Sequence, residues 1–257
     1  MLHVHEWGPA DAPPIVCLHG ITGHGRRFRK LAEERLAGRF RVLAPDLLGH
    51  GLSEWEPPWS IKAHLDALVS TLEHAGVGAA RWIGHSFGGR LVMELTARDR
   101  SRVERAVLLD PAIWVPPPVA LERAEDERRE RAWETHEAAM EARLAKGELL
   151  PHAVPLLAED YRDHLVSAGD GLLRPRYSQS AVVTAFSEMA APPPDFAVLD
   201  VPTLIIRGRL SNVTVDPLVD LYRDGVGDLL EVVEVPGYHS PFWDAFDETA
   251  DAIDRFF

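Results

Sequence analysis

The sequence of 257 residues has one cysteine and no apolar run long enough to cross a bilayer. Cys17 lies inside the apolar run PPIVCLHG, so no internal disulfide can form, and we interpret the thiol as buried packing instead of a nucleophile. The first residues also lack a basic stretch followed by an apolar one, which is the pattern of a secretion signal. We therefore expect a folded protein of the cytoplasm that does not bind a membrane.

Positive charge is also scarce, with 27 Lys and Arg against 40 Asp and Glu and a formal net charge of −13. Nucleic acids are bound by clustered Lys and Arg in excess, so the composition argues against a nucleic-acid partner. An acidic substrate would need a local concentration of positive charge. No His-Glu-x-x-His pair and no Cys-x-x-Cys spacing is present, which predicts no catalytic metal and no other cofactor.

Short β-branched runs alternate with longer amphipathic segments, which is the order of a mostly parallel sheet flanked by helices. The expected strands are PPIVCLH, RVLAPD, ARWIGHS, RAVLLD, TLIIRG and LEVVEVPG. The expected helices lie near residues 27–36, 61–74, 88–98, 217–225 and 241–257. The predicted fold class is therefore α/β.

The alternation is interrupted between residues 111 and 199, where the proline-rich joints WVPPPVA and AAPPPDF bracket charged sequence. We expect this segment to be an inserted helical cap, with residues 1–110 and 200–257 forming the core. Within it, LERAEDERRERAWETHEAAMEARLAKGELL mixes charges of both signs at helical spacing. That pattern predicts a solvated helix stabilised by i,i+4 ion pairs.

The most specific motif is WIGHSFGG, which places Ser86 in the pattern G-x-S-x-G between a β-rich run and a helical run. Gly84 and Gly88 flank the expected strand-to-helix turn, where the lack of a side chain permits a tight bend. The Ser86 hydroxyl would then project from an elbow at the start of a helix. The alternative is a glycine-rich turn whose serine only caps that helix.

A serine hydroxyl needs a base within hydrogen-bond reach, and His239 follows the last expected strand in VPGYHSPFWDAF. A loop at this place can bring an imidazole to the elbow, whereas the alternative is a surface histidine. The turn LHGITG follows the first expected strand, and we expect the backbone N–H groups of Ile21 and Phe87 to form an oxyanion hole. The other histidines are interpreted as structural.

Six motifs together resemble the α/β-hydrolase superfamily with an inserted cap, over essentially the whole chain: LHGITG, DLLGHGLS, GHSFGG, LLDPA, VPTLIIRG and PGYHSPFWDAFDETADAIDRFF. The resemblance implies a sheet of the eight-stranded type, a Ser-His-acid triad and an active site between core and cap. Such families contain carboxylesterases, lactonases and C–C bond hydrolases. They also contain dehalogenases and epoxide hydrolases with an aspartate nucleophile, against which Ser86 argues.

The acid of the triad is where this sequence departs from the family. Most relatives carry it in the loop after the strand TLIIRG, at the position of Asn212 here. An asparagine can orient an imidazole but has no charge to stabilise the imidazolium. We expect Asp110 to be the acid, because it ends a neighbouring strand at the same edge as Ser86, although an aspartate before proline also starts turns. Asn212 without a carboxylate, and Asp216 at an expected helix start, are the alternatives.

These residues predict a serine hydrolase that cleaves a small-molecule carboxylic ester or lactone through an acyl-enzyme, without a cofactor, as a monomer or homodimer. A C–C bond hydrolase of diketone-type compounds with the same triad is an alternative. A non-catalytic binding protein is another, since a fold alone does not fix function.

An apolar substrate pocket under the cap is expected from four residues, Ile113, Trp114, Phe242 and Trp243, with ordinary core packing as the alternative. Trp133 is either part of it or an ordinary core aromatic. His24, Arg26 and Arg27 lie just past the oxyanion turn, where a cation could meet an acidic substrate. Solvated charges at a helix start are the simpler interpretation of these three.

Overall fold

The computed structural model describes residues 1–257, and its core is a seven-stranded sheet in the order β1-β3-β2-β4-β5-β8-β9. The strands are β1 (Val4–Trp7), β2 (Pro14–Leu18), β3 (Arg41–Pro45), β4 (Ala80–His85), β5 (Val103–Leu109), β8 (Thr203–Gly208) and β9 (Leu230–Val235). Only β1 is antiparallel to its neighbour, with Val4 opposite Pro45 of β3. The fold class is therefore the predicted α/β class with a mostly parallel sheet.

All six strands expected from the sequence are present, and β1 is an addition. Its sequence, VHEW, is short and polar, so it lacks the β-branched run that marked the others. The sheet has seven strands where the resemblance implied the eight-stranded type.

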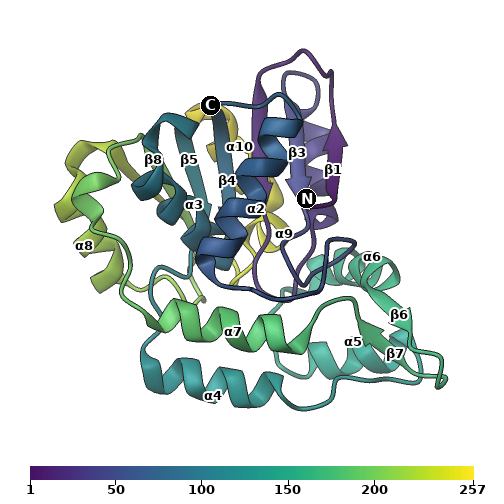
Figure 1. Cartoon of the computed structure of the whole chain (residues 1–257). Coiled ribbons are helices and arrows are strands. Elements are labelled where there is room, and N and C mark those ends of the chain that lie inside the picture. Colours follow the sequence, from purple (N-terminus) through teal and green to yellow (C-terminus); the bar gives the residue numbers. More distant parts are fainter.

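Helices cover both faces of this sheet (Figure 1). One face packs against α2 (Ile61–His74), α3 (Phe87–Arg98) and α8 (Asp216–Val226), which contribute Leu65, Leu91 and Val219 to one apolar cluster. The other face packs against residues 25–36, α9 (Pro241–Asp244) and α10 (Phe246–Phe256). None of the helices is both long and apolar enough to cross a membrane.

Two of the expected helices are divided. Residues 25–36 form a 3₁₀ turn (Gly25–Phe28), a short α-helical turn α1 (Arg29–Leu31) and a π turn (Ala32–Leu36) in place of one α-helix. The C-terminal segment breaks at Ala245, whose backbone leaves the helical region with φ −141° and ψ 62°.

The chain between β5 and β8 crosses one end of the sheet and lies below it in Figure 1. It contains α4 (Pro117–Glu127), α5 (His136–Leu144), α6 (Val154–His164), the antiparallel hairpin β6 (Leu165–Ser167) and β7 (Leu173–Pro175), and α7 (Gln179–Ala190). We call residues 111–199 the inserted segment. The hairpin was not expected, because the sequence predicted helices alone.

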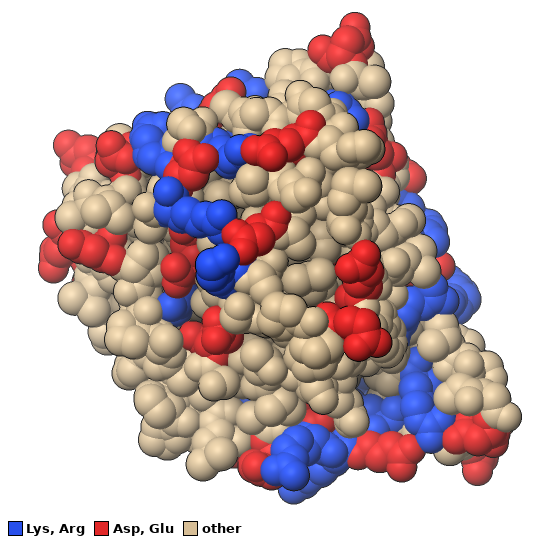
Figure 2. All heavy atoms as spheres, in the orientation of Figure 1, with Lys and Arg blue, Asp and Glu red and all other residues tan.

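The charged sequence of the inserted segment forms two helices, α4 and α5, where one was expected. The break occurs because Trp133 pairs with Leu173 of the hairpin through two backbone hydrogen bonds of 3.0 and 2.7 Å. Thr135 then restarts the helix as an N-cap that accepts from the Ala138 N–H at 3.1 Å. The face of the molecule in Figure 2 shows acidic and basic side chains interspersed, as the sequence indicated for a solvated surface.

A buried carboxylate fastens the inserted segment to the core. Asp160 of α6 is 5% exposed and accepts hydrogen bonds from Arg27 Nε (3.0 Å), Arg27 Nη2 (2.8 Å) and His24 Nε2 (2.8 Å). Burial alone would raise the pKa of Asp160, but the Arg27 charge and the His24 hydrogen bond outweigh it and hold the pKa well below its usual range. Arg27 is therefore a partly buried ion-pair partner, with its side chain 16% exposed, and not only a solvated charge at a helix start.

We predict that Asp160→Asn lowers the free energy of unfolding by about 3 kcal/mol at pH 7, because it leaves the largely covered Arg27 guanidinium without a counter-charge. Asp163→Asn removes only the more exposed pair with Arg26 and should cost below about 1 kcal/mol. Urea unfolding measures both.

The contribution of Asp160 to the free energy of unfolding depends on pH. The pKa of Asp160 is lower in the folded than in the unfolded chain, so its stabilisation is complete above about pH 5 and is lost as the pH falls. The difference between wild type and Asp160→Asn should therefore shrink in acid. A difference that stays constant or grows there would contradict this assignment.

Candidate active site

Ser86 lies between β4 and α3 in a backbone conformation that non-glycine residues rarely adopt, with φ 54° and ψ −117°. The two motif glycines permit this turn. A Cβ on Gly84 would stand 2.6 Å from the Gly88 carbonyl oxygen, and one on Gly88 would stand 2.2 Å from the Leu18 carbonyl oxygen. The serine is therefore presented on a strained elbow at the start of a helix, as the sequence predicted.

His239 lies in the loop after β9 and bridges the other two residues of the predicted triad. A carboxylate only accepts, so His239 Nδ1–H donates to Asp110 Oδ2 at 2.7 Å. This tautomer leaves Nε2 free to accept from the Ser86 hydroxyl at 2.9 Å. Ser86, His239 and Asp110 thus form one continuous chain of hydrogen bonds.

Asp110 follows β5 directly and is fully buried, with a positive φ of 43°. Ser211 Oγ donates a second hydrogen bond to the same oxygen, Oδ2, while Oδ1 is buried without a partner. Burial by itself raises the pKa of Asp110, but the hydrogen bonds and charge of His239 together with Ser211 outweigh it and lower the pKa. The carboxyl group is therefore ionised at neutral pH.

The two alternative residues lie elsewhere. Asn212 is exposed and its side chain makes no hydrogen bond, while its neighbour Ser211 contacts Asp110. Asp216 is exposed, accepts from Arg207 Nη2 at 2.5 Å, and is the first residue of α8 instead of its cap, which is Val215. Of the three residues, only Asp110 contacts the His239 imidazole.

The N–H groups of the two predicted oxyanion donors, Ile21 and Phe87, have no hydrogen-bond acceptor within the protein. Phe87 is the first residue of α3, so its N–H has no acceptor within the helix, and the N–H of Ile21 has no acceptor in the protein. Gly20 brings the two together, because a Cβ there would stand only 2.8 Å from the Ser86 Cβ. Both donors therefore lie on the two segments that meet at Ser86.

His19 holds this turn in place. Its Nε2 accepts from the Leu47 N–H at 2.9 Å, so the proton is on Nδ1, which donates to the Gly20 carbonyl at 2.8 Å. Burial lowers the pKa of His19 well below its usual value, which keeps the ring neutral and this tautomer intact. The structural role expected for His19 is what the geometry describes.

His85 has a role that the sequence did not reveal. Its Nε2–H donates to the backbone carbonyl of His239 at 2.7 Å, and burial lowers the pKa of His85 to about 3, so the ring is neutral. The elbow thereby holds the backbone of the histidine as well as carrying the serine. The only signal in the sequence was its place directly before Ser86.

A pocket of about 220 Å³ opens beside Ser86, between the core and the inserted segment. The core contributes Ile21, Ser86, His239 and Trp243 to its wall. The inserted segment contributes charged and aromatic residues: Glu127, Arg131, Trp133, Arg143, Lys146, Tyr161, His164 and Tyr177. The expectation of an apolar pocket is therefore wrong, because most of the lining residues are polar or charged.

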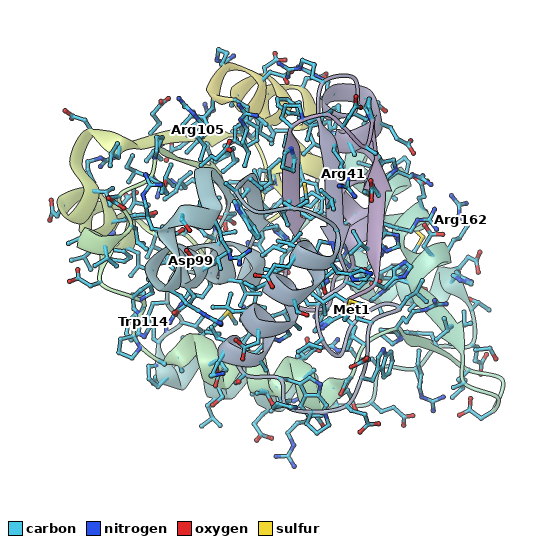
Figure 3. All side chains as sticks on the ribbon, turned by 45° about the horizontal axis from the view of Figure 1, so that its top comes forward. Met1, Arg41, Asp99, Arg105, Trp114 and Arg162 are labelled. Carbon is cyan, nitrogen blue, oxygen red and sulfur yellow. The ribbon has the colours of Figure 1, made fainter.

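Of the four residues expected to line this pocket, only Trp243 does so, together with Trp133. Ile113 is fully buried in the core cluster that contains α3. Trp114 lies at the edge of the molecule (Figure 3), where its Nε1–H donates to the Ala190 carbonyl at 3.1 Å. Phe242 stacks on Phe28 under the elbow. Proximity in sequence to the catalytic motifs was thus a poor guide to pocket position.

One group of metal-ligating side chains lies at the edge of the sheet, where atoms of His3, His5 and Asp46 are within 4.8 Å of one another. Asp46 already accepts from Gly25 N–H (2.7 Å), Leu52 N–H (2.9 Å) and His5 Nε2 (3.2 Å). Its oxygens are thus engaged in holding loops, and none of the three residues lines the pocket. Cys17 is buried in the core, as expected.

A family model described as the alpha/beta hydrolase fold matches residues 13–246. The chain therefore belongs to the alpha/beta hydrolase fold family, which confirms the resemblance seen in its motifs.

Individual relatives are similar over different lengths. The chain is 36% identical over 200 residues to Lipase LipV of Mycobacterium tuberculosis (strain ATCC 25618 / H37Rv), covering 74% of this chain and 71% of that one. It is 36% identical over 99 residues to Esterase YbfF of Escherichia coli (strain K12), covering 38% and 39%. A crystal structure of E-2-(acetamidomethylene)succinate hydrolase superposes with a TM-score of 0.86 at 25% identity, over 99% of this chain and 94% of that chain.

The geometry predicts how Ser86 reactivity depends on its partners. Asp110→Asn should slow the labelling of Ser86 by a fluorophosphonate about 10³-fold or more, because the imidazole loses its counter-charge and its fixed tautomer. Asn212→Ala and Asp216→Asn should change the labelling rate by less than about threefold, since neither contacts His239. The reverse ranking of Asp110 and Asn212 would overturn the assignment of the acid.

Proposed function

We propose that this protein hydrolyses carboxylic esters or lactones through a covalent acyl-enzyme on Ser86. The observation that carries the proposal is the hydrogen-bonded chain from Ser86 through His239 to the buried Asp110, at the wall of a pocket. A nucleophile, a base and an orienting carboxylate in this order are what acyl transfer requires.

In the first step, His239 Nε2 takes the Ser86 proton as Oγ attacks the carbonyl carbon of the substrate. The resulting imidazolium is stabilised by the ionised Asp110. The oxyanion of the tetrahedral intermediate accepts from the Ile21 and Phe87 N–H groups, which need no reorganisation because the turn and the helix hold them. The imidazolium then protonates the leaving alcohol, and the acyl group remains on Ser86.

In the second step, His239 takes a proton from a water molecule, which attacks the acyl carbon. The intermediate collapses, Ser86 Oγ leaves with the proton from His239, and the acid product is released. No cofactor takes part in this sequence.

We further propose that the inserted segment acts as a cap that selects the substrate, since it supplies a large part of the pocket wall. The similarity to a lipase and an esterase supports ester hydrolysis as the reaction, and the backbone N–H pair favours a carbonyl substrate over an alkyl halide or epoxide.

The direct test is initial-rate hydrolysis of p-nitrophenyl esters of increasing acyl length. Wild type should turn over at least one of them, and Ser86→Ala should reduce the rate by about 10⁴-fold or more, because the other groups cannot form the acyl-enzyme. Rapid quenching should show the acyl group on Ser86 by mass spectrometry.

Asn212→Ala is the control, since Asn212 follows Ser211, which contacts Asp110, but its own exposed side chain lies outside the hydrogen-bonded chain. Equal turnover by wild type and Ser86→Ala, or a folded wild type that neither hydrolyses any ester nor reacts with a fluorophosphonate, would refute the proposal.

A further inference from the structure

The pocket beside Ser86 is lined by four basic side chains, Arg27, Arg131, Arg143 and Lys146, and by one acidic side chain, Glu127. In a chain with a formal charge of −13, this local excess of positive charge is the reverse of the overall balance. Positive charge inside a cleft attracts anions because the low-dielectric walls focus the field. A cation in this pocket can bind an anionic ligand only if no carboxylate of the protein already neutralises it.

Two of the four are already neutralised. Arg27 is held by both oxygens of Asp160. Arg131 donates from Nε and Nη2 to the two oxygens of Glu127 at 2.9 and 2.7 Å, and from Nη2 to Asp126 at 3.0 Å. These paired cations shape the wall and leave little charge for a substrate.

The other two, Arg143 and Lys146, lie at and just after the C-terminal end of α5, and neither is hydrogen-bonded to a carboxylate. Arg143 Nη2 donates to the Glu148 backbone carbonyl at 3.2 Å. Arg143 Nη1 is buried without a hydrogen-bond acceptor and has only a long ion pair, at 4.0 Å, to the Glu148 carboxylate. Lys146 lines the pocket and makes neither an ion pair nor a hydrogen bond through its side chain. A buried guanidinium N–H without an acceptor is costly, which points to an acceptor that arrives with the substrate.

A third unpartnered group lines the same pocket. His164 Nε2 is buried without a hydrogen-bond partner, and the residue is 3% exposed. Burial and the nearby His24 and Arg27 charges lower the pKa of His164 well below its usual value, so the ring is neutral. Because the His164 ring is neutral, it can hydrogen-bond to a polar group of the substrate, while the charges of Arg143 and Lys146 attract an anion.

We propose that the substrate carries an ionised carboxylate in addition to the ester, and that Arg143 and Lys146 bind that carboxylate. This inference deepens the proposed function and rests on it for the ester. Arginine binds a carboxylate through two parallel N–H donors, a stronger and more directional contact than a neutral hydrogen bond. The class of substrate is therefore a half-ester of a dicarboxylic acid, or a lactone with a free carboxylate.

The test compares pairs of substrates that differ only in charge. Monomethyl esters of dicarboxylic acids from four to eight carbons are paired with the same esters in which the free carboxyl group is a primary amide. Hydrolysis is followed by pH-stat. At low ionic strength, kcat/KM for the best acid should exceed that of its amide by about tenfold or more, and added salt should reduce this preference.

Substitutions locate the site. Arg143→Gln should lower kcat/KM for the acid by about 10- to 100-fold and for the amide by less than about threefold, and Lys146→Gln should give a smaller effect of the same kind. Arg143→Lys keeps the charge and should restore part of the preference. Arg128→Gln is the matched control, since Arg128 is an exposed arginine of the same segment that does not line the pocket.

Different results would contradict the carboxylate site and the proposed ester hydrolysis. Turnover that depends on Ser86 but is equal for acid and amide across the series, or a preference that Arg143→Gln leaves intact, would overturn the inference alone. Absence of turnover and of fluorophosphonate labelling would refute the proposed function. In that case, calorimetric titration of Ser86→Ala with each acid of the series and its amide still tests the carboxylate site, and equal affinities in every pair would overturn it.

Discussion

The buried contact between Asp110 and His239 is the interaction on which the arrangement of the site depends. A carboxylate with no exposure to solvent remains charged because two donors, His239 Nδ1 and Ser211 Oγ, converge on one of its oxygens. That charge fixes the tautomer of the imidazole, and the tautomer leaves Nε2 facing Ser86. The positive φ values of Ser86 and Asp110 are the local strain that the parallel strands β4 and β5 sustain to aim both side chains at one point.

The sequence predicted the elements whose signals are local. Buried parallel strands are near-continuous apolar runs, so all six could be predicted, and the glycines around Ser86 marked a turn that only small residues permit. β1 was not predicted, because VHEW at the sheet edge has no such run. The break between α4 and α5 escaped because it is made by pairing with a hairpin 40 residues further along the chain, near Leu173, and helical spacing carries no information on that contact.

The site divides in the same way. Ser86, His239 and Asp110 could be placed from the order of the strands, because the ends of parallel strands meet at one edge of the sheet. The pocket could not be predicted in this way, because much of its wall comes from the folded inserted segment. The charged residues of that segment have the sequence pattern of a solvated helix surface. Arg27 is an example: its sequence position indicated a charge at a helix start, and only the position of Asp160, 133 residues away, makes it the partner of a buried carboxylate.

Moving the acid from the loop after β8 to the end of β5 has a consequence for how this protein can change. Ser86, His239, Asp110 and the free N–H groups of Ile21 and Phe87 all belong to the sheet and its adjoining turns, and the inserted segment supplies none of them. The inserted segment instead supplies a large part of the pocket wall, to which the core adds residues such as Ile21 and Trp243. The loop around Asn212 contributes a supporting hydroxyl from Ser211. Under the proposed function, a change in the inserted segment would alter the choice of substrate and leave the hydrogen-bonded chain from Ser86 to Asp110 intact.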